Sequence, residues 1–285
     1  MEGLPSSVKQ VISGSAAGIS ATLLVHPLDT IRTRVQTADV SGVQYRGAID
    51  CAAKTLKYEG LQAFYKGITF PLLAQAVYKS VIFTSYHAMQ SLFPQTDGPP
   101  PIPRVMLCGA AAGGINSFVV TPVELIRNNL MVQYDHKTEP RRWRNSMELV
   151  KDLTKRNGIT GLWRGIGPTF LRDSIGVASW FGSFEVCLRY LCPHIGLSGT
   201  PALLLSGVSG GIGFWVAAFP LDTIKSLVQV EASSHRGSAI SVLLSLVRNG
   251  ELHKLFRGFG VAVMRGIPGA AITFTVQRKT REALG

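Results

Sequence analysis

Three copies of a short charged motif lie within apolar stretches of the chain, and each copy combines an acid with a base. A proline is followed two residues later by a carboxylate and five residues later by a basic residue. The copies are Pro27-Leu28-Asp29-Thr30-Ile31-Arg32, Pro122-Val123-Glu124-Leu125-Ile126-Arg127 and Pro220-Leu221-Asp222-Thr223-Ile224-Lys225. Residues three apart on a helix share a face, and charges at membrane depth are costly unless they are paired or face water. The motif therefore predicts ion pairs, either within each helix or between neighbouring helices.

A second repeated element locates a candidate ligand site. It combines an aromatic residue, a base and a glycine, as Tyr65-Lys66-Gly67, Trp163-Arg164-Gly165 and Phe256-Arg257-Gly258. Seven residues after each glycine stand Ala74, Arg172 and Arg265. The repeat predicts that these three positions lie at equal depth on three related helices, where transporters bind their substrates.

Arg172 and Asp173 are adjacent ionisable residues in an apolar segment, which is a functional hypothesis by default. Neighbours in sequence do not face one another on a helix, which favours a role in ligand binding over the alternative, an Arg172–Asp173 pair that only satisfies itself. An arginine binds a carboxylate through two hydrogen bonds, and Asp173 could meet an ammonium group. Arg265 supplies a second cation, which could take the carboxylate or balance Asp173.

The predicted helix around Ala74 contributes further side chains. Tyr78 lies on the same face as Ala74 and either stacks on a cationic group or packs between helices. Lys79, four residues after Gln75, lines the cavity or pairs with an acid that the sequence does not identify. Ala74 offers no polar group, which is compatible with a methylated amine or an aliphatic chain.

The elements that must position these residues are long and apolar. Hydrophobic residues make up 46% of the 285 residues and charged residues only 16%, below the quarter or so that is usual in soluble domains. Six segments are each long enough for a hydrocarbon core, which needs about 20 residues. They run roughly over residues 8–36, 68–92, 103–133, 166–192, 202–230 and 259–280.

The segments repeat as pairs. The three prolines are 95 and then 98 residues apart, and each is preceded at the same distance by a GxxxG pattern, which lets helices approach closely in lipid. These patterns are Gly14 with Gly18, Gly109 with Gly113, and Gly207 with Gly211. The long loops 37–66, 134–164 and 231–257 carry many Lys and Arg residues. All three fall on one side if six helices span, as charge rules for topology expect, and both termini fall on the other.

Several other classes of function fit poorly. The net charge is +12, but the basic residues lie in three separate loops, which argues against nucleic-acid binding. The four cysteines show no CxxC spacing, so we expect no metal site and no cofactor. Phosphate-binding loops and nucleophile motifs are missing, which argues against an enzyme. A soluble helical-repeat scaffold remains an alternative, although its helices would be amphipathic.

The repeated Pro-acid-base and aromatic-base-Gly motifs resemble those of the mitochondrial carrier family (solute carrier family 25), over nearly the whole chain. An acid-Gly element is intact as Glu59-Gly60, but reads Asn157-Gly158 and Asn249-Gly250 in the later repeats. The resemblance implies an all-α membrane protein with six transmembrane helices and short matrix helices. Three two-helix repeats, residues 1–97, 98–198 and 199–285, would have pseudo-threefold symmetry. It also implies a multi-pass location in the mitochondrial inner membrane, with a peroxisomal membrane or a plastid envelope as alternatives. A functional monomer and transport of a small solute by alternating access are implied as well.

The resemblance implies two gates. The pairs Asp29–Arg127, Glu124–Lys225 and Asp222–Arg32 would close the matrix side. Gln36 and Gln229 could brace this ring through hydrogen bonds, whereas the third equivalent, Met131, cannot. At the cytoplasmic side only Glu185 and Arg281 have opposite charges at the expected positions, so we predict one bridge and a weak gate there.

The neighbours Arg172 and Asp173 resemble the branch of the family that carries carnitine, ornithine and basic amino acids. We therefore expect an amine-bearing solute, with a nucleotide or a carboxylate as the alternative. The resemblance also implies that cardiolipin binds at helix starts, where backbone N–H groups attract phosphates; the alternative is simple helix capping. The glycines at these starts are Gly47, Gly67, Gly165, Gly237 and Gly258.

Overall fold

The computed structural model describes residues 6–38, 43–94, 98–133, 143–230 and 239–283, and every regular element within these ranges is helical. The long helices match the six predicted segments closely. They are α1 (Ser6–Gln36), α4 (Thr69–Ser91), α5 (Ile102–Val132), α7 (Ile166–Val186), α9 (Gly199–Gln229) and α12 (Gly266–Ala283), which follows the short α11 (Phe259–Met264).

Shorter helices connect the long ones. After each proline-containing helix comes one amphipathic helix, namely α3 (Ala48–Glu59), α6 (Ser146–Asn157) and α10 (Ala239–Arg248). Each is followed by one turn of 3-10 helix, at Leu61–Tyr65, Ile159–Trp163 and Leu252–Phe256. Helix α7 ends in a π-helical turn (Cys187–Leu191) that leads into α8 (Cys192–His194). Within the described residues, the order of a proline-containing helix, an amphipathic helix and a 3-10 turn therefore occurs three times, whereas the π-helical turn and α8 occur only after α7.

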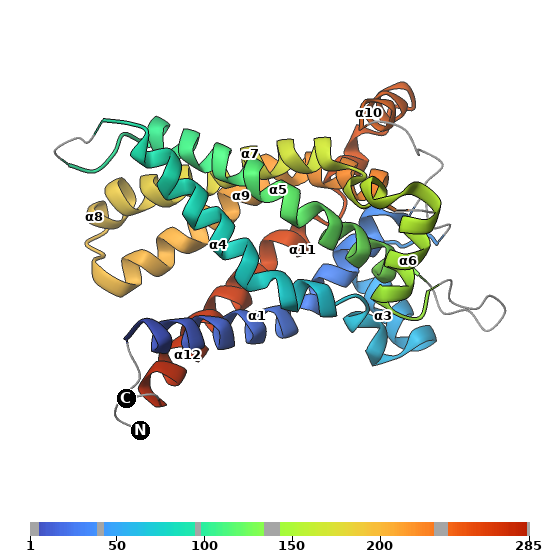
Figure 1. The fold of residues 1–285 in the computed structure, drawn as a ribbon, viewed down its shortest axis with the longest axis horizontal. Helices are drawn as coiled ribbons and strands as arrows, with labels where there is room; N and C mark the ends of the chain where they lie inside the picture. Colours follow the sequence, from blue (N-terminus) through green and yellow to red (C-terminus); the bar gives the residue numbers. More distant parts are fainter. Residues whose placement is uncertain (1–5, 39–42, 95–97, 134–142, 231–238, 284–285) are drawn as a thin grey trace.

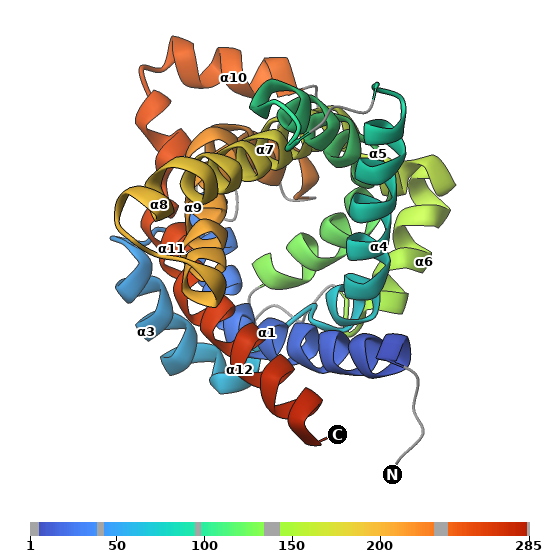
Figure 2. The ribbon, with the colours of Figure 1, turned by 90° about the vertical axis from the view of Figure 1, so that its left-hand side faces the viewer.

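The long helices surround a central opening (Figure 2). Both termini lie at one end of the molecule, while α3, α6 and α10 lie at the other (Figure 1), which we call the short-helix end. This agrees with the topology expected from the basic loops. Helix α5 packs along α7, α7 along α9, and α1 along α12.

The GxxxG prediction holds in only one repeat. A Cβ atom on Gly113 would lie 2.3 Å from the carbonyl oxygen of Asp173, so this glycine permits the close approach of α5 to α7. No atom lies within 4 Å of such a Cβ at Gly14, Gly207 or Gly211. In the first repeat Gly18 instead borders a cavity. The glycine pattern therefore stabilises a helix contact only in the second repeat.

Two of the helices in the described ranges, α5 and α9, are both long and apolar enough to cross a membrane. All six predicted segments form helices, as expected, and the other four do not combine that length with that hydropathy. Helices α1, α4 and α7 include charged residues that lie at the centre of the molecule or line its cavity, such as Arg32, Lys79 and Arg172. Charged residues are tolerated at membrane depth when they face water or a partner of opposite charge.

Candidate functional site

The six charged residues of the repeated motif meet at the centre of the bundle and form what we call the charged ring. The prolines lie inside α1, α5 and α9, and the acid and base that follow each proline point inward. Arg32 pairs with Asp222 across α1 and α9, and Lys225 pairs with Glu124 across α9 and α5. These are two of the three pairs that the resemblance implied.

The third pair is looser. Arg127 Nη1 lies 3.9 Å from Asp29 Oδ2, while Arg127 Nη2 lies 3.6 Å from Glu124 Oε1 on its own helix. Both arrangements expected from the motif, between helices and within one helix, are therefore present at this residue. The α1–α5 contact is the weakest side of the charged ring because a separation near 4 Å is the outer limit of an ion pair.

One of the two expected glutamine braces is present. Gln36 Nε2 donates to Asp222 Oδ2 at 3.1 Å and to Thr223 Oγ1 at 3.2 Å, so it supports the Arg32–Asp222 pair. Gln229 does not contact its pair in the same way, because its side-chain oxygen accepts from Asn128 Nδ2 at 2.9 Å. Gln229 links α5 to α9 beside the charged ring, so its expected role as a brace of the Glu124–Lys225 pair was wrong.

Arg172 and Asp173 are joined to each other and to the charged ring. Arg172 Nη1 lies 2.8 Å from Asp173 Oδ1, and Arg172 Nη2 lies 2.6 Å from Glu124 Oε2. Our expectation that adjacent residues would not pair was wrong, because the long arginine side chain reaches back to its neighbour. Asp173 is only 3% exposed, and its Oδ2 atom has no hydrogen-bond partner in the part of the chain that the structure describes.

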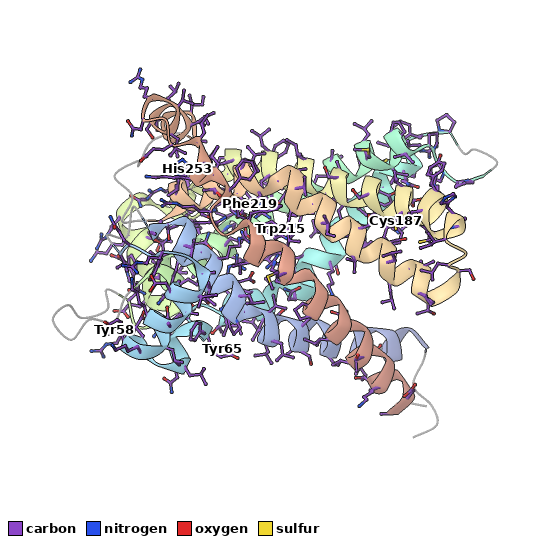
Figure 3. All side chains as sticks on the ribbon, turned by 180° about the vertical axis from the view of Figure 1, so that it is seen from behind. Tyr58, Tyr65, Cys187, Trp215, Phe219 and His253 are labelled. Atoms are coloured by element: carbon purple, nitrogen blue, oxygen red, sulfur yellow. The ribbon has the colours of Figure 1, made fainter. Side chains whose placement is uncertain are left out.

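Arg265 also enters the charged ring instead of standing alone. It pairs with Asp29, and its guanidinium carbon lies 4.6 Å from the ring centre of Trp215. The guanidinium carbon of Arg32 lies 4.3 Å from the same ring, and Phe219 packs beside Trp215 on α9 (Figure 3). One indole therefore stabilises two arginines by cation–π contact.

Trp215 was missed by the sequence analysis, although a signal was present. It lies five residues before Pro220, where the other two repeats carry Thr22 and Ser117. A single aromatic at a position that is otherwise small and polar indicates a feature specific to the third repeat.

A cavity of about 300 Å³ lies between α1, α4, α5, α9 and α12 and reaches the charged ring at Asp29 and Arg127. Of the predicted ligand residues, Gln75, Lys79 and Arg265 line it. Asp29, Arg127 and Trp215 line it as well, together with His26 and the small residues of α1. Ala74 and Tyr78 are partly buried on α4, and the Tyr78 hydroxyl has no hydrogen-bond partner among the described atoms.

At the terminal end the expected pair of Glu185 and Arg281 is untested, because the side chain of Arg281 lies outside the described residues. Glu185 instead pairs with Arg189 on its own helix at 2.6 Å. Arg189 Nη1 also donates to the carbonyl oxygen of Pro100 at 2.8 Å. These contacts tie α7 to the start of α5 at this end.

Arg34 forms a further buried ion pair at the short-helix end. Its guanidinium pairs with Glu59 at the end of α3 and donates to the carbonyl oxygen of Met131 at 2.9 Å. Lys66 binds the same carboxylate at 2.5 Å and the carbonyl oxygen of Gln133 at 2.8 Å. Burial would raise the pKa of Glu59, but hydrogen bonds from Arg34 and Lys66 outweigh it and lower this pKa below its ordinary value.

The predicted lipid-binding elements of neighbouring repeats come together in one place. A cavity of about 170 Å³ is lined by Lys66 and Gly67 from the first repeat and by Trp143, Arg144 and Asn145 from the second. Gly67 has a positive φ of 77°, and a Cβ atom there would lie 3.1 Å from the carbonyl oxygen of Arg127.

The other glycines of this group differ in their roles. Gly47 precedes α3, Gly165 precedes α7 and Gly258 precedes α11, the last two in left-handed conformation. Gly237 lies outside the described residues. Helix capping, the simpler alternative, is realised at α6, where the Asn145 side chain accepts from the backbone N–H of Glu148 at 2.9 Å.

The three repeats are also recognised when the chain is compared with known proteins. A family model described as mitochondrial carrier protein matches residues 4–97, 98–194 and 198–285. A carnitine/acylcarnitine carrier-like protein of Arabidopsis thaliana is 29% identical over 97% of this chain and 98% of its own length. Mitochondrial ornithine transporter 1 of Saccharomyces cerevisiae is 28% identical over 96% and 94%. Mitochondrial magnesium exporter 1 of Drosophila melanogaster is 32% identical over 97% and 95%. The named cargoes of these relatives differ.

Proposed function

The chain belongs to the mitochondrial carrier family, whose members are solute transporters and not enzymes, and we propose that it carries a small metabolite with a carboxylate and an amine. The proposed location is the mitochondrial inner membrane, which the chain crosses several times. The proposed repeats are residues 1–97, 98–198 and 199–285. A monomer suffices because residues of all three repeats line the central cavity.

The proposed mechanism is alternating access, with the charged ring as the gate at the short-helix end. The pairing of the ring residues across α1, α5 and α9 supports a closed gate at this end. An ion pair at the border of a water-filled cavity contributes about 1 kcal/mol, and more when buried. The ring therefore sums to a few kcal/mol, which a solute can offset if it binds better to the open state.

The observation that carries this proposal is the position of Arg172. It is a candidate ligand residue by sequence, yet its guanidinium lies 2.6 Å from Glu124, an acid of the gate. A solute carboxylate that binds Arg172 competes with Glu124 and loosens the gate at the same time. Arg265 is coupled to the gate in the same way, because a solute carboxylate that binds Arg265 releases Asp29 from its pair with that arginine.

The charges around the central cavity support a carboxylate on the solute. Among the described residues, Lys79, Arg127 and Arg265 line the cavity together with one acid, Asp29. A carboxylate on Arg265 would leave Asp29 for the amine of the same solute. The volume of about 300 Å³ lies at the small end of ligand pockets, which favours a small metabolite over a nucleotide.

Uptake into liposomes that contain the purified protein tests the proposal. The panel is carnitine, choline, ornithine, lysine, arginine and methylated amino acids, with ADP and malate as contrasts. We expect saturable uptake of a solute with both a carboxylate and an amine, and none of choline, which lacks the carboxylate. Uptake of ADP alone would overturn the proposed solute class.

A carboxylate without an amine is the second candidate. The excess of three cations over one acid around the cavity favours it, because each cation that does not contact a solute carboxylate needs another anionic partner. Malate in the panel distinguishes the two. Uptake of malate with no uptake of any amine-bearing solute would select this candidate.

Cardiolipin is the proposed lipid at the cavity of about 170 Å³ between the first two repeats. Lys66 and Arg144 provide positive charge there, and α6 begins beside it, so its N-terminal N–H groups favour a phosphate. We expect cardiolipin to raise the melting temperature of the protein in detergent, and Arg144→Ala to reduce that effect. An equal effect of a neutral lipid would contradict the proposal.

A further inference from the structure

The C-terminal end of α7 contains an unusual turn that brings two cysteines together. Residues Cys187–Leu191 form a π-helical turn, in which the backbone N–H of Cys192 donates to the carbonyl oxygen of Cys187. Such turns are rare and occur frequently at functional sites. The turn lies at the end of the molecule away from His253 and the short helices (Figure 3).

The turn changes what the two thiols can do. In a regular α-helix, residues five apart are separated by roughly 7.5 Å along the axis, which is too far for a disulfide. The π-helical turn places both residues in one hydrogen-bonded ring, and the sulfur atoms of Cys187 and Cys192 lie 3.9 Å apart. Both residues are free thiols.

The surroundings of the pair combine burial with a route of access. Cys192 Sγ lies 3.7 Å from the hydroxyl oxygen of Ser206 on α9, which can stabilise a sulfur anion. Cys187 borders a cavity of about 450 Å³ between α7 and α9, which Ser183 and Ser209 also line. The cavity is large enough for a molecule the size of hydrogen peroxide to lie beside Cys187, although both thiols are almost fully buried.

We propose that Cys187 and Cys192 form a redox site that hydrogen peroxide oxidises to a disulfide within α7. The thiolate of Cys187 attacks one peroxide oxygen, so the O–O bond breaks, Cys187 becomes a sulfenic acid and one water leaves. The Cys192 sulfur then displaces the sulfenic hydroxyl, which leaves as a second water with the remaining proton. Two thiols and one peroxide thus give one disulfide and two waters.

The disulfide would fix the turn that positions Arg189. This residue lies within the turn, pairs with Glu185 before it and donates to the carbonyl oxygen of Pro100. The same helix carries Arg172 toward the charged ring. Oxidation therefore restrains the helix that connects the terminal end to the gate.

Mass spectrometry of the full-length protein tests the proposal without reference to transport. The protein is treated with graded hydrogen peroxide, unfolded, alkylated and digested. We expect a Cys187–Cys192 disulfide at peroxide concentrations that leave Cys51 and Cys108 fully alkylated. These two residues are the matched controls, since both are buried cysteines and neither has a second cysteine as its partner in the described contacts.

The variant Cys192→Ser separates the two chemical steps. It should retain the attack on peroxide but not the resolution, so Cys187 should accumulate as a sulfenic acid that dimedone traps. Full alkylation of all four wild-type cysteines after peroxide treatment would overturn the proposal. Oxidation of Cys51 or Cys108 at the same rate as the pair would do so too.

Discussion

Arg172 on α7 lies 2.6 Å from the carboxylate of Glu124 on α5, so the proposed ligand residue contacts an acid of the proposed gate. The same guanidinium contacts Asp173 at 2.8 Å and approaches Asp222 to 3.8 Å. Three acids therefore share the Arg172 guanidinium. A ligand that binds this guanidinium weakens its ion pairs with all three acids.

Replacement of Arg172 should remove uptake of the solute. The variant Arg172→Ala loses the carboxylate contact, and Arg172→Lys keeps the charge but not the two-pronged geometry. We expect uptake by Arg172→Ala to fall by at least about a hundredfold, as the loss of about 3 kcal/mol at a buried charged contact implies. Arg172→Lys should retain a small part of the activity. Initial rates in liposomes measure this, and unchanged uptake by Arg172→Ala would refute the role of Arg172.

The Arg32–Asp222 pair should contribute strongly to stability. Arg32→Ala leaves a buried carboxylate without its main partner, and such a loss costs about 3–5 kcal/mol. The matched control is Arg156→Ala, which breaks the exposed Arg156–Asp152 pair and should cost about 0–1 kcal/mol. Unfolding in detergent measures both. Equal effects of the two substitutions would show that the charged ring does not stabilise the closed state.

Gly67 should tolerate alanine less well than Gly60, although the two have nearly equal φ angles of 77° and 78°. Gly60→Ala meets no neighbouring atom within 4 Å, so it should cost only the backbone strain of φ 78° and ψ −179°, a conformation that is essentially limited to glycine, at about 1–3 kcal/mol. Gly67→Ala also pushes toward the Arg127 carbonyl, and overpacking adds about 1–3 kcal/mol. A larger loss of unfolding free energy in Gly67→Ala than in Gly60→Ala would support that contact. Equal costs would mean that the first repeat does not touch α5 at this point.

The lowered pKa of Glu59 predicts a loss of stability in acid. The carboxylate is favoured in the folded state, so its stabilisation is fully present above the ordinary pKa of 4.5 and is lost as pH falls through the lower folded pKa. Glu59→Gln should therefore melt below the wild type at pH 7, and the gap should close toward pH 3. Melting temperatures across this range provide the test. A gap that stays constant with pH would contradict the role of ionised Glu59.

Much of the architecture could be predicted from the repeated motifs. The bounds of α1, α4, α5, α7 and α9 fall within about six residues of the expected segments. Apolar runs of about 20 residues are predictable because they form membrane-spanning helices. The positions of Asp29, Arg32 and their equivalents were also predictable, since three copies of one motif impose the symmetry of the charged ring.

The departures from symmetry were harder to predict. The Arg172–Asp173 contact depends on a side-chain conformation that helical spacing does not determine. Trp215 occurs in one repeat, and the GxxxG contact expected in all three repeats forms only at Gly113, so the threefold pattern alone does not predict where either feature lies. The pairing of Arg34 with Glu59 is likewise confined to the first repeat, because the equivalent acids are Asn157 and Asn249. The threefold repetition of the motif predicts the charged ring, but it does not predict the features that occur in only one repeat.

The central claim is that a bound solute opens the gate through Arg172. The most direct measurement labels a cysteine introduced at the gate by Ser226→Cys, beside Gln36, with a water-soluble maleimide from the short-helix side. The parent chain, in which Cys51, Cys108, Cys187 and Cys192 are all buried, gives the background. We predict that the transported solute raises the labelling rate severalfold, and that Arg172→Ala removes this increase. The same increase in the absence of Arg172, or no increase with it, would contradict the account.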